Sequence, residues 1–283
     1  MSETPAAQTA SMTSDLKRRV PSAIAMIVLA LGVTWYGSFP FLLFWTLAAL
    51  IVWYEWAVIV RLRHKTTVLA LGVFVVAAAA VLVSMHFPMA AFGAILAGAV
   101  VAFLLAGDET ATRLWSGGGL IYAGLAFLPV VLLRNDAEYG FSAVIWLYAV
   151  VWLTDIAAYF AGRFIGGPKL APVISPKKTW SGAIGGTLFG VLGGAGVAAY
   201  ATGNFVFMHV VIAFAVSLFS QAGDIFESFV KRKFGKKDSS GILPGHGGVM
   251  DRIDGFIAGA ALALVIGLAT GGMKSPAAGL LQW

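Results

Sequence analysis

Long apolar stretches dominate this sequence and constrain its fold more than any other feature. About nine stretches of roughly 20 apolar residues follow one another after Lys17, and each is long enough to cross the hydrocarbon of a bilayer as a helix. Hydrophobic residues make up 59% of the 283 residues and charged residues 11%, which is more apolar surface than a soluble domain of this length can bury. The sequence therefore predicts an all-α, polytopic transmembrane helical bundle.

The expected spans cover nearly the whole chain. They are residues 20–36, 39–60, 67–86, 88–106, 116–133, 141–162, 181–202, 205–226 and 254–273. The polar segment 1–19 is expected to be a disordered cytoplasmic tail and not a cleaved signal peptide, because the apolar run after it leads almost directly into another. We expect N-terminal transmembrane helices over 20–140 and a catalytic transmembrane region with two cytoplasmic motif loops over 141–283.

Basic residues occur in every second connection between these spans. They precede the first span and follow the second, fourth, sixth and eighth, whereas the opposite connections hold only Arg134 and Lys274. Lys and Arg concentrate in cytoplasmic loops, so this alternation places the N-terminus inside and the C-terminus outside. We expect an integral protein of a bacterial-type inner (plasma) membrane whose active site faces the cytoplasm.

Composition excludes several kinds of chemistry. The chain has no cysteine, which rules out disulfides, zinc–thiolate sites and a cysteine nucleophile. The net charge of +6 fits topology and attraction to anionic headgroups of membrane lipids better than binding to nucleic acid. Glycine-rich stretches at 185–186, 193–196 and 255–259 are typical of closely packed transmembrane helices.

Two segments combine carboxylates at the membrane boundary with basic residues, Gly and Pro. The first covers 154–182 and the second 220–255. Ionisable side chains inside a membrane span are costly, so Asp155, Asp224 and Glu227 need partners, and a functional role is the default interpretation. Glu55, near the end of the second span, carries no such supporting motif, and we interpret it as structural.

The carboxylates of the second segment predict a site for a hard cation. Asp251 and Asp254 are three residues apart, so a helix places both on one face, and Asp224 is available to share the ion. Oxygen ligands without Cys or paired His favour magnesium or manganese. We expect Mg²⁺ bound to a nucleotide, and a second cation is left open.

Clustered basic residues beside these acids predict phosphate binding. Lys177, Lys178, Lys231, Arg232, Lys237 and Arg252 would neutralise phosphate charge, and the amides of Gly245, Gly247 and Gly248 could approach phosphate oxygens. His246 could contact a phosphate or the leaving group, or serve as a hydrogen-bonding cap. The alternative for each lysine is binding to lipid headgroups or setting topology.

The second segment resembles the signature of the CDP-diacylglycerol synthases, also called phosphatidate cytidylyltransferases. The matching residues are Ser228, Val230, Lys231-Arg232, Lys237-Asp238, His246-Gly247-Gly248 and Asp251-Arg252-Ile253-Asp254. The first segment is similar to an upstream motif of that family through Asp155, Tyr159, Gly162-Arg163, Lys169-Leu170, Ser175 to Trp180 and Gly182. Many members carry Glu where this chain has Ser181, so no acidic role is assigned there.

The resemblance implies a membrane enzyme that transfers CMP from CTP to phosphatidic acid, releases pyrophosphate, requires magnesium and forms a homodimer. It implies catalytic roles for Asp224, Asp251, Lys237 and His246, and metal binding by Asp224, Asp251 and Asp254. The implied substrate-binding residues are Asp155, Ser175, Lys177, Lys178, Thr179, Ser228, Lys231, Arg232, Gly247, Gly248 and Arg252. Such a reaction is achieved chiefly by positioning and charge stabilisation, which fits these residue types.

Two other classes of function are alternatives, a transporter and another membrane enzyme that acts on a lipid phosphate or alcohol. A cation-coupled transporter would explain the intramembrane acids but not the lysines and glycines gathered beside them. A polyprenol kinase or a CDP-alcohol phosphotransferase would also act at a lipid phosphate or alcohol. The Asp-Gly-x-x-Ala-Arg motif of the latter is missing, because Asp254-Gly255 is followed by Phe256-Ile257-Ala258-Gly259.

Overall fold

A computed structural model describes residues 24–62, 66–107, 110–243 and 247–283 of the chain. An apolar helix, Ile24–Tyr36, comes first. The remaining helices are α2 (Ser38–Ile59), α3 (Thr66–Ser84), α4 (Pro88–Leu105), α5 (Thr110–Arg134), α6 (Gly140–Phe164), α7 (Trp180–Thr202), α8 (Phe207–Lys233), α9 (Met250–Gly271) and α10 (Pro276–Leu281). Between α6 and α7, strands β1 (Lys169–Ala171) and β2 (Ser175–Thr179) pair antiparallel, with Lys169 opposite Thr179.

The predicted helical membrane bundle is confirmed. Eight of the described helices, α2 to α9, are long and apolar enough to cross a membrane. The helix Ile24–Tyr36 is shorter, and the first residues of the expected span 20–36 lie outside the described residues. Neither the hairpin nor the six-residue α10 was expected from the sequence.

The boundaries of α8 and α9 differ from the expected spans in a way that matters for the site. α8 continues to Lys233 where we expected an end near residue 226, and α9 begins at Met250 where we expected residue 254. Glu227 and Lys231 lie one turn apart and form an ion pair, which favours continued helix. Gly235, with φ of 69°, then ends it by allowing the Lys236 amide to bond back to the Lys231 carbonyl.

Glycines let α6 and α7 pack with their backbones in contact. The buried face of α7 carries Gly182, Gly186, Gly190 and Gly194 at a period of four. A Cβ atom added at Gly186 would lie 2.6 Å from the carbonyl oxygen of Thr154 on α6. The predicted close packing is therefore confirmed for this pair. The hairpin connects the end of α6 to the start of α7.

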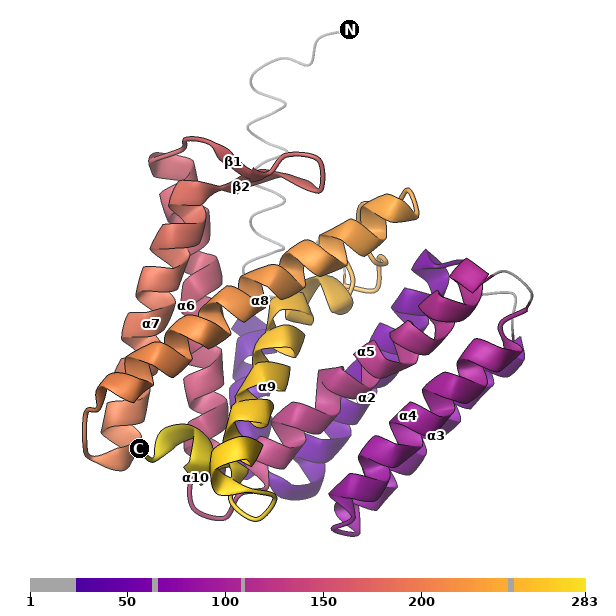
Figure 1. Ribbon diagram of the computed structural model, residues 1–283, viewed down its shortest axis with the longest axis horizontal. Helices are drawn as coiled ribbons and strands as arrows, with labels where there is room; N and C mark the ends of the chain where they lie inside the picture. Colours follow the sequence, from indigo (N-terminus) through magenta and orange to yellow (C-terminus); the bar gives the residue numbers. More distant parts are fainter. Residues whose placement is uncertain (1–23, 63–65, 108–109, 244–246) are drawn as a thin grey trace, which may run out of the picture.

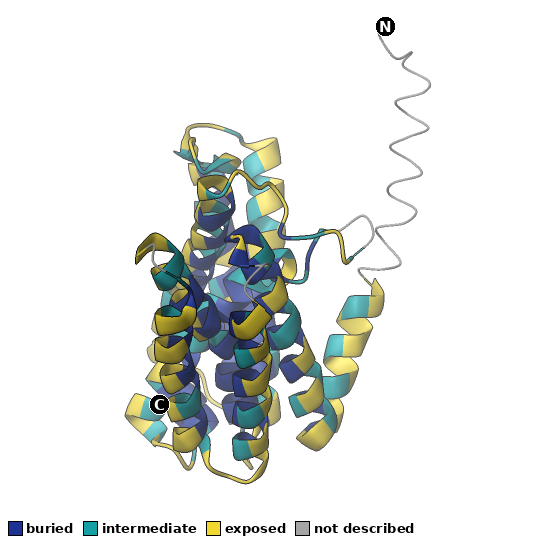
Figure 2. Cartoon of the chain, turned by 90° about the vertical axis from the view of Figure 1, so that its right-hand side faces the viewer, coloured by how far each residue is buried: buried dark blue, intermediate teal, exposed yellow. Residues whose placement is uncertain are grey.

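The elements that carry the two motif segments gather at one end of the bundle (Figure 1). The hairpin, the end of α8 and the start of α9 lie together at one end, on the same side as the end of α2 and the start of α5. α5 is central, because 78% of its most apolar window is buried, compared with 28% in the peripheral α4. Figure 2 shows the buried residues along the inner faces of the helices and the exposed ones facing outward, as expected for a bundle surrounded by lipid.

Candidate active site

The two motif segments meet at the hairpin end of the bundle. Lys178, on β2, forms an ion pair with Asp224 on α8, with Nζ 2.5 Å from Oδ2. Arg232, near the end of α8, donates through Nε to the carbonyl of Ile174 in the hairpin at 3.4 Å. These contacts join segments that are about 50 residues apart in the chain, as the shared function predicted for them requires.

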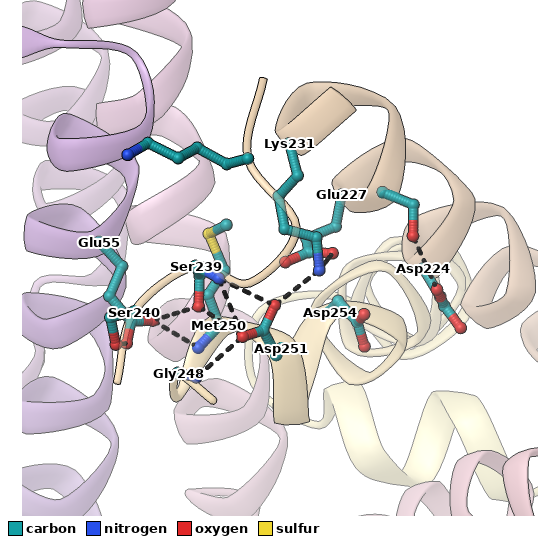
Figure 3. Close-up of polar contacts among 12 residues, drawn as sticks. Glu55, Asp224, Glu227, Lys231, Ser239, Ser240, Gly248, Met250, Asp251 and Asp254 are labelled. Atoms are coloured by element: carbon teal, nitrogen blue, oxygen red, sulfur yellow. Dashed lines mark hydrogen bonds and ion pairs between the residues drawn. The ribbon is translucent and has the colours of Figure 1, made fainter. Parts of the chain in front are cut away.

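A buried lysine lies between two carboxylates where α8 crosses α9 (Figure 3). Lys231 Nζ is 2.6 Å from Glu227 Oε2 and 2.6 Å from Asp251 Oδ1. The side chain of Glu227 is fully buried, and that of Asp251 is 7% exposed. Charged side chains are tolerated away from water only when they are paired. Lys231 therefore stabilises the contact between α8 and α9 by pairing with an acid on each helix.

Asp251 is held in place by donors from the connection between α8 and α9. Its Oδ2 accepts hydrogen bonds from the Ser239 amide at 3.0 Å, the Ser239 hydroxyl at 2.9 Å and the Gly248 amide at 2.8 Å. A side chain at position 248 would overlap Ser239 Oγ and Glu55 Oε1, which explains the glycine there. The predicted role of the Gly248 amide toward substrate stays a prediction, since this amide donates to Asp251.

Glu55, on α2, reaches the same connection from the N-terminal half. Its fully buried carboxylate accepts from the Ser240 hydroxyl at 2.5 Å, the Ser239 hydroxyl at 3.3 Å and the amides of Val249 and Met250 at 3.0 and 2.7 Å. Figure 3 shows these groups converging on the start of α9. Glu55 therefore makes contacts that stabilise the start of α9, in line with the interpretation from the sequence.

Three further carboxylates face the same region with fewer partners. Asp254 accepts a hydrogen bond from its neighbour, the Gly255 amide, at 2.7 Å, and interacts electrostatically with Asp224, Glu227 and Asp155. Asp155, on α6, interacts electrostatically with Asp224 and with Lys178. Figure 3 places Asp254 between Asp251 and Asp224. In the described parts of the chain, these three carboxylates have one basic partner in an ion pair, Lys178.

The donor set suits a magnesium ion shared with phosphates. The described residues contain no group of three or more His, Cys, Asp or Glu side chains close enough to enclose a metal by themselves. Magnesium commonly takes one or two protein carboxylates and completes its shell with water and phosphate oxygens, and Asp224 and Asp254 have oxygen atoms to spare. Asp251 would exchange one of its present partners to join them. The three predicted metal ligands stay predictions.

Other residues predicted to bind substrate or to take part in catalysis lie on the hairpin, on α8, on α9 and in the α8–α9 connection. Ser228 Oγ lies 3.5 Å from Asp224 Oδ1. Lys177 and Lys237 are exposed, and Arg252 is exposed on the first turn of α9. Thr179 caps α7, since its hydroxyl accepts from the Gly182 amide at 3.1 Å.

The remaining predictions concern the hairpin and the glycine-rich turn. Ser175 is partly buried on β2, and Gly247 adopts a φ of 81° beside the start of α9. His246 lies outside the described residues. Sequence reasoning missed Ser239 and Ser240, whose only signal is that they follow Lys237-Asp238 directly.

Comparison with known proteins identifies the family. The model of the cytidylyltransferase family matches residues 17–269. The chain belongs to the cytidylyltransferase family. It is 42% identical over 255 residues to a phosphatidate cytidylyltransferase of Brucella suis biovar 1, covering 90% of this chain and 94% of that protein. A phosphatidate cytidylyltransferase of Staphylococcus haemolyticus is 41% identical over 137 residues, covering 48% of this chain and 52% of that protein.

Membership of the cytidylyltransferase family makes this protein a nucleotidyltransferase and confirms the resemblance drawn from the motif residues. The contact between the two motif segments fits this family. A cytidylyltransferase must hold a nucleoside triphosphate beside a second anionic group, and the hairpin and the α8–α9 crossing bring basic side chains and carboxylates to one place.

Proposed function

We propose that this protein transfers CMP from CTP to phosphatidic acid, giving CDP-diacylglycerol and pyrophosphate. A lipid phosphate oxygen forms a bond to the α-phosphorus of CTP, and the bond from that phosphorus to the bridging oxygen of the β-phosphate breaks. The observation that supports this reaction most directly is the joining of the two motif segments through Lys178 and Asp224. It places basic groups and carboxylates together at the end of a membrane bundle, where a soluble nucleotide and a lipid can both arrive.

The chain's residues would mainly oppose repulsion between two anions. The attacking phosphate oxygen is already anionic at neutral pH, so no strong general base is needed, and the exposed Lys177, Lys237 and Arg252 would bind phosphate oxygens. Mg²⁺ held by Asp224, Asp251 and Asp254 would neutralise the triphosphate. Lys178 and Lys231 would keep the ligand carboxylates oriented through their ion pairs.

An apolar cavity beside Arg252 supports a lipid substrate. The cavity has a volume of about 570 Å³ and lies between the helix Ile24–Tyr36, α2, α6 and α9. Aromatic side chains line it, including Trp45, Tyr148, Trp152 and Phe256, and Arg252 is the one charged residue among its lining. An acyl chain could lie in this cavity with its phosphate at Arg252, one residue from Asp251.

We also propose the orientation and assembly that the sequence predicted. The hairpin end, which carries the basic connections, would face the cytoplasm, where CTP is found, and the protein would be an inner-membrane homodimer. The end of α7 and the end of α8 lie at opposite ends of the bundle. Because the chain lacks cysteine, single cysteines at Asn204, which follows α7, and at Gly241, which follows α8, would test orientation with an impermeant thiol reagent in intact cells. Labelling of Gly241→Cys and protection of Asn204→Cys would contradict it.

Position-specific labels in CTP would test the reaction. Purified protein in detergent is incubated with Mg²⁺, phosphatidic acid and CTP labelled at either the α- or the γ-phosphate. A cytidylyltransferase places the α-label in the lipid and releases the γ-label as pyrophosphate. A lipid kinase would place the γ-label in the lipid instead, and an absence of label in the lipid from either substrate would overturn the proposal.

Matched variants would test the site and the cavity. Asp224→Asn and Asp251→Asn should each abolish turnover, whereas Glu138→Gln, in the exposed connection between α5 and α6, should not. Ile51→Trp fills the lipid cavity and should raise the KM for phosphatidic acid but not for CTP. Leu114→Trp fills a second apolar cavity, between α5 and α8, and serves as the control. The reverse pattern would assign the lipid to that second cavity.

A further inference from the structure

We propose that Glu55 is a positioning residue for this enzyme: it holds Ser239, Ser240 and the first turn of α9 in place so that Asp251 stays aligned with the reacting groups. Glu55 lies on α2, far from both motif segments in the sequence. The effect on turnover rests on the proposed function, whereas the effect on the position of Ser239 and Ser240 does not.

Four donors converge on the Glu55 carboxylate, and they come from both sides of the turn before α9. Oε1 accepts from the Ser240 hydroxyl and the Val249 amide, and Oε2 accepts from the Met250 amide and lies 3.3 Å from the Ser239 hydroxyl. The carboxylate is fully buried, so no water replaces these partners if it is removed. Glu55 thereby ties the connection to a helix that belongs to the other half of the chain.

Ser239 connects Glu55 to the acidic cluster. Its hydroxyl lies 3.3 Å from Glu55 Oε2 and 2.9 Å from Asp251 Oδ2, and its single proton can serve only one of them at a time. Its amide also donates to Asp251. Asp251 in turn binds Lys231, which binds Glu227. A continuous path of polar contacts therefore runs from α2 through the connection to α9 and α8, as Figure 3 shows.

The start of α9 needs this external carboxylate because its own sequence provides no cap. Val249 precedes the helix and has no side-chain hydrogen bond to offer the first amides. These amides carry the positive end of the helix dipole, and a carboxylate is their best partner. Asp251 accepts from Gly248 but leaves the amides of Val249 and Met250 to Glu55. Loss of the carboxylate would free the turn that carries Asp251.

Asp136 provides a matched comparison at the opposite end of the bundle. It is 7% exposed and also accepts four hydrogen bonds, from the amides of Glu138 and Tyr139 and, at the start of α10, of Ala277 and Ala278. Like Glu55 it caps a helix from a distance, but no contact within the described parts of the chain joins it to the acidic cluster. A purely structural role predicts the same consequences for loss of either carboxylate.

The first experiment compares Glu55→Gln with Asp136→Asn in the detergent-purified full chain. We expect both to lower the unfolding temperature by similar amounts. Glu55→Gln should also lower kcat for CDP-lipid formation by about tenfold or more, with little change in the KM for either substrate, because misplacement of a catalytic group raises the barrier more than it weakens binding. Asp136→Asn should leave kcat within about twofold, a difference below 0.5 kcal/mol.

The second experiment follows the position of the connection without using activity. A cysteine at Gly241 would be the chain's only thiol, and its Cβ atom would meet nothing within 4 Å, so a nitroxide spin label can be attached there. Glu55→Gln should increase the mobility of this label, and Asp136→Asn should not. Unchanged mobility in Glu55→Gln, or a kcat no lower than that of Asp136→Asn, would overturn the proposal. An inactive wild type would refute the proposed function alone, and the label would still decide whether Glu55 holds the connection.

Discussion

Removal of the buried cation at the α8–α9 crossing should be among the most destabilising single changes at this end of the protein. Lys231→Met leaves Glu227, which is fully buried, and Asp251, which is 7% exposed, facing each other without the ammonium group 2.6 Å from both. Removal of one partner from a buried ion pair costs about 3–5 kcal/mol, and here one cation serves two acids. The free energy of unfolding should therefore fall by at least about 3 kcal/mol.

Lys233→Met is the matched control, because it makes the same replacement two residues later on the same helix. Lys233 is exposed, and its Nζ lies 5.1 Å from the Trp115 ring and 6.0 Å from the Phe229 ring. Loss of such cation–π contacts at an exposed site costs about 0.5–1 kcal/mol. The two variants should differ by at least about 2 kcal/mol, roughly a 30-fold change in the unfolding equilibrium.

A second change should restore part of the loss in Lys231→Met. Glu227→Gln removes one of the two unpaired charges, so the double variant should recover at least about 1 kcal/mol relative to Lys231→Met. Unfolding by sodium dodecyl sulfate in mixed micelles, followed through the nine tryptophans of the chain, measures all four proteins. The reasoning is refuted if Lys231→Met costs no more than Lys233→Met, or if Glu227→Gln restores nothing.

Further predictions concern the hairpin, the helix packing, the lipid and the metal. Thr179→Ala should lower stability by about 1 kcal/mol through loss of the α7 cap, while Thr179→Ser should not, as thermal unfolding would reveal. Gly186→Leu should prevent α6–α7 packing and reduce the yield of folded protein, whereas Gly196→Ala, whose Cβ meets nothing within 4 Å, should have no effect on that yield. Arg252→Ala should raise the KM for phosphatidic acid more than the KM for CTP, as initial rates would show. Removal of divalent ions with EDTA should abolish product formation, and Mg²⁺ should restore it.

Sequence patterns could predict the bundle because lipid imposes a simple rule. A helix that crosses a bilayer needs about 20 apolar residues, and this length can be read directly from the chain. The same rule gave a wrong end for α8 and a wrong start for α9, because Ser228, Lys231 and Asp251 are polar and were expected to lie outside the helices. Their polarity is satisfied within the protein by mutual contacts, and hydropathy carries no information on such contacts.

The sequence predicted which residues belong to the site better than it predicted what each residue does there. Lys231 was expected to bind phosphate, as its place in the motif implied, and its side chain, only 10% exposed, lies between two acids. The environment of Glu55 could not be predicted, because its partners Ser239 and Ser240 are 184 and 185 positions away. Contacts at that separation depend on how α2 packs against the start of α9, which no local pattern specifies.

The buried carboxylates of this protein fall into two groups, which differ in how many hydrogen-bond donors and basic side chains they contact. Glu55 and Asp136 each accept hydrogen bonds from donors within the fold, and each caps a helix, so the burial of both carboxylates is explained without a bound cation. Asp155, Asp224 and Asp254 differ, because they face one another, and Lys178 is the one cation seen in an ion pair with any of them in the described parts of the chain. Clustered acids with so few partners weaken the fold, and intramembrane charge of this kind persists where a function requires it. The cluster of carboxylates between α6, α8 and α9 is therefore the feature that folding does not explain and that a cation-dependent nucleotidyltransferase would use.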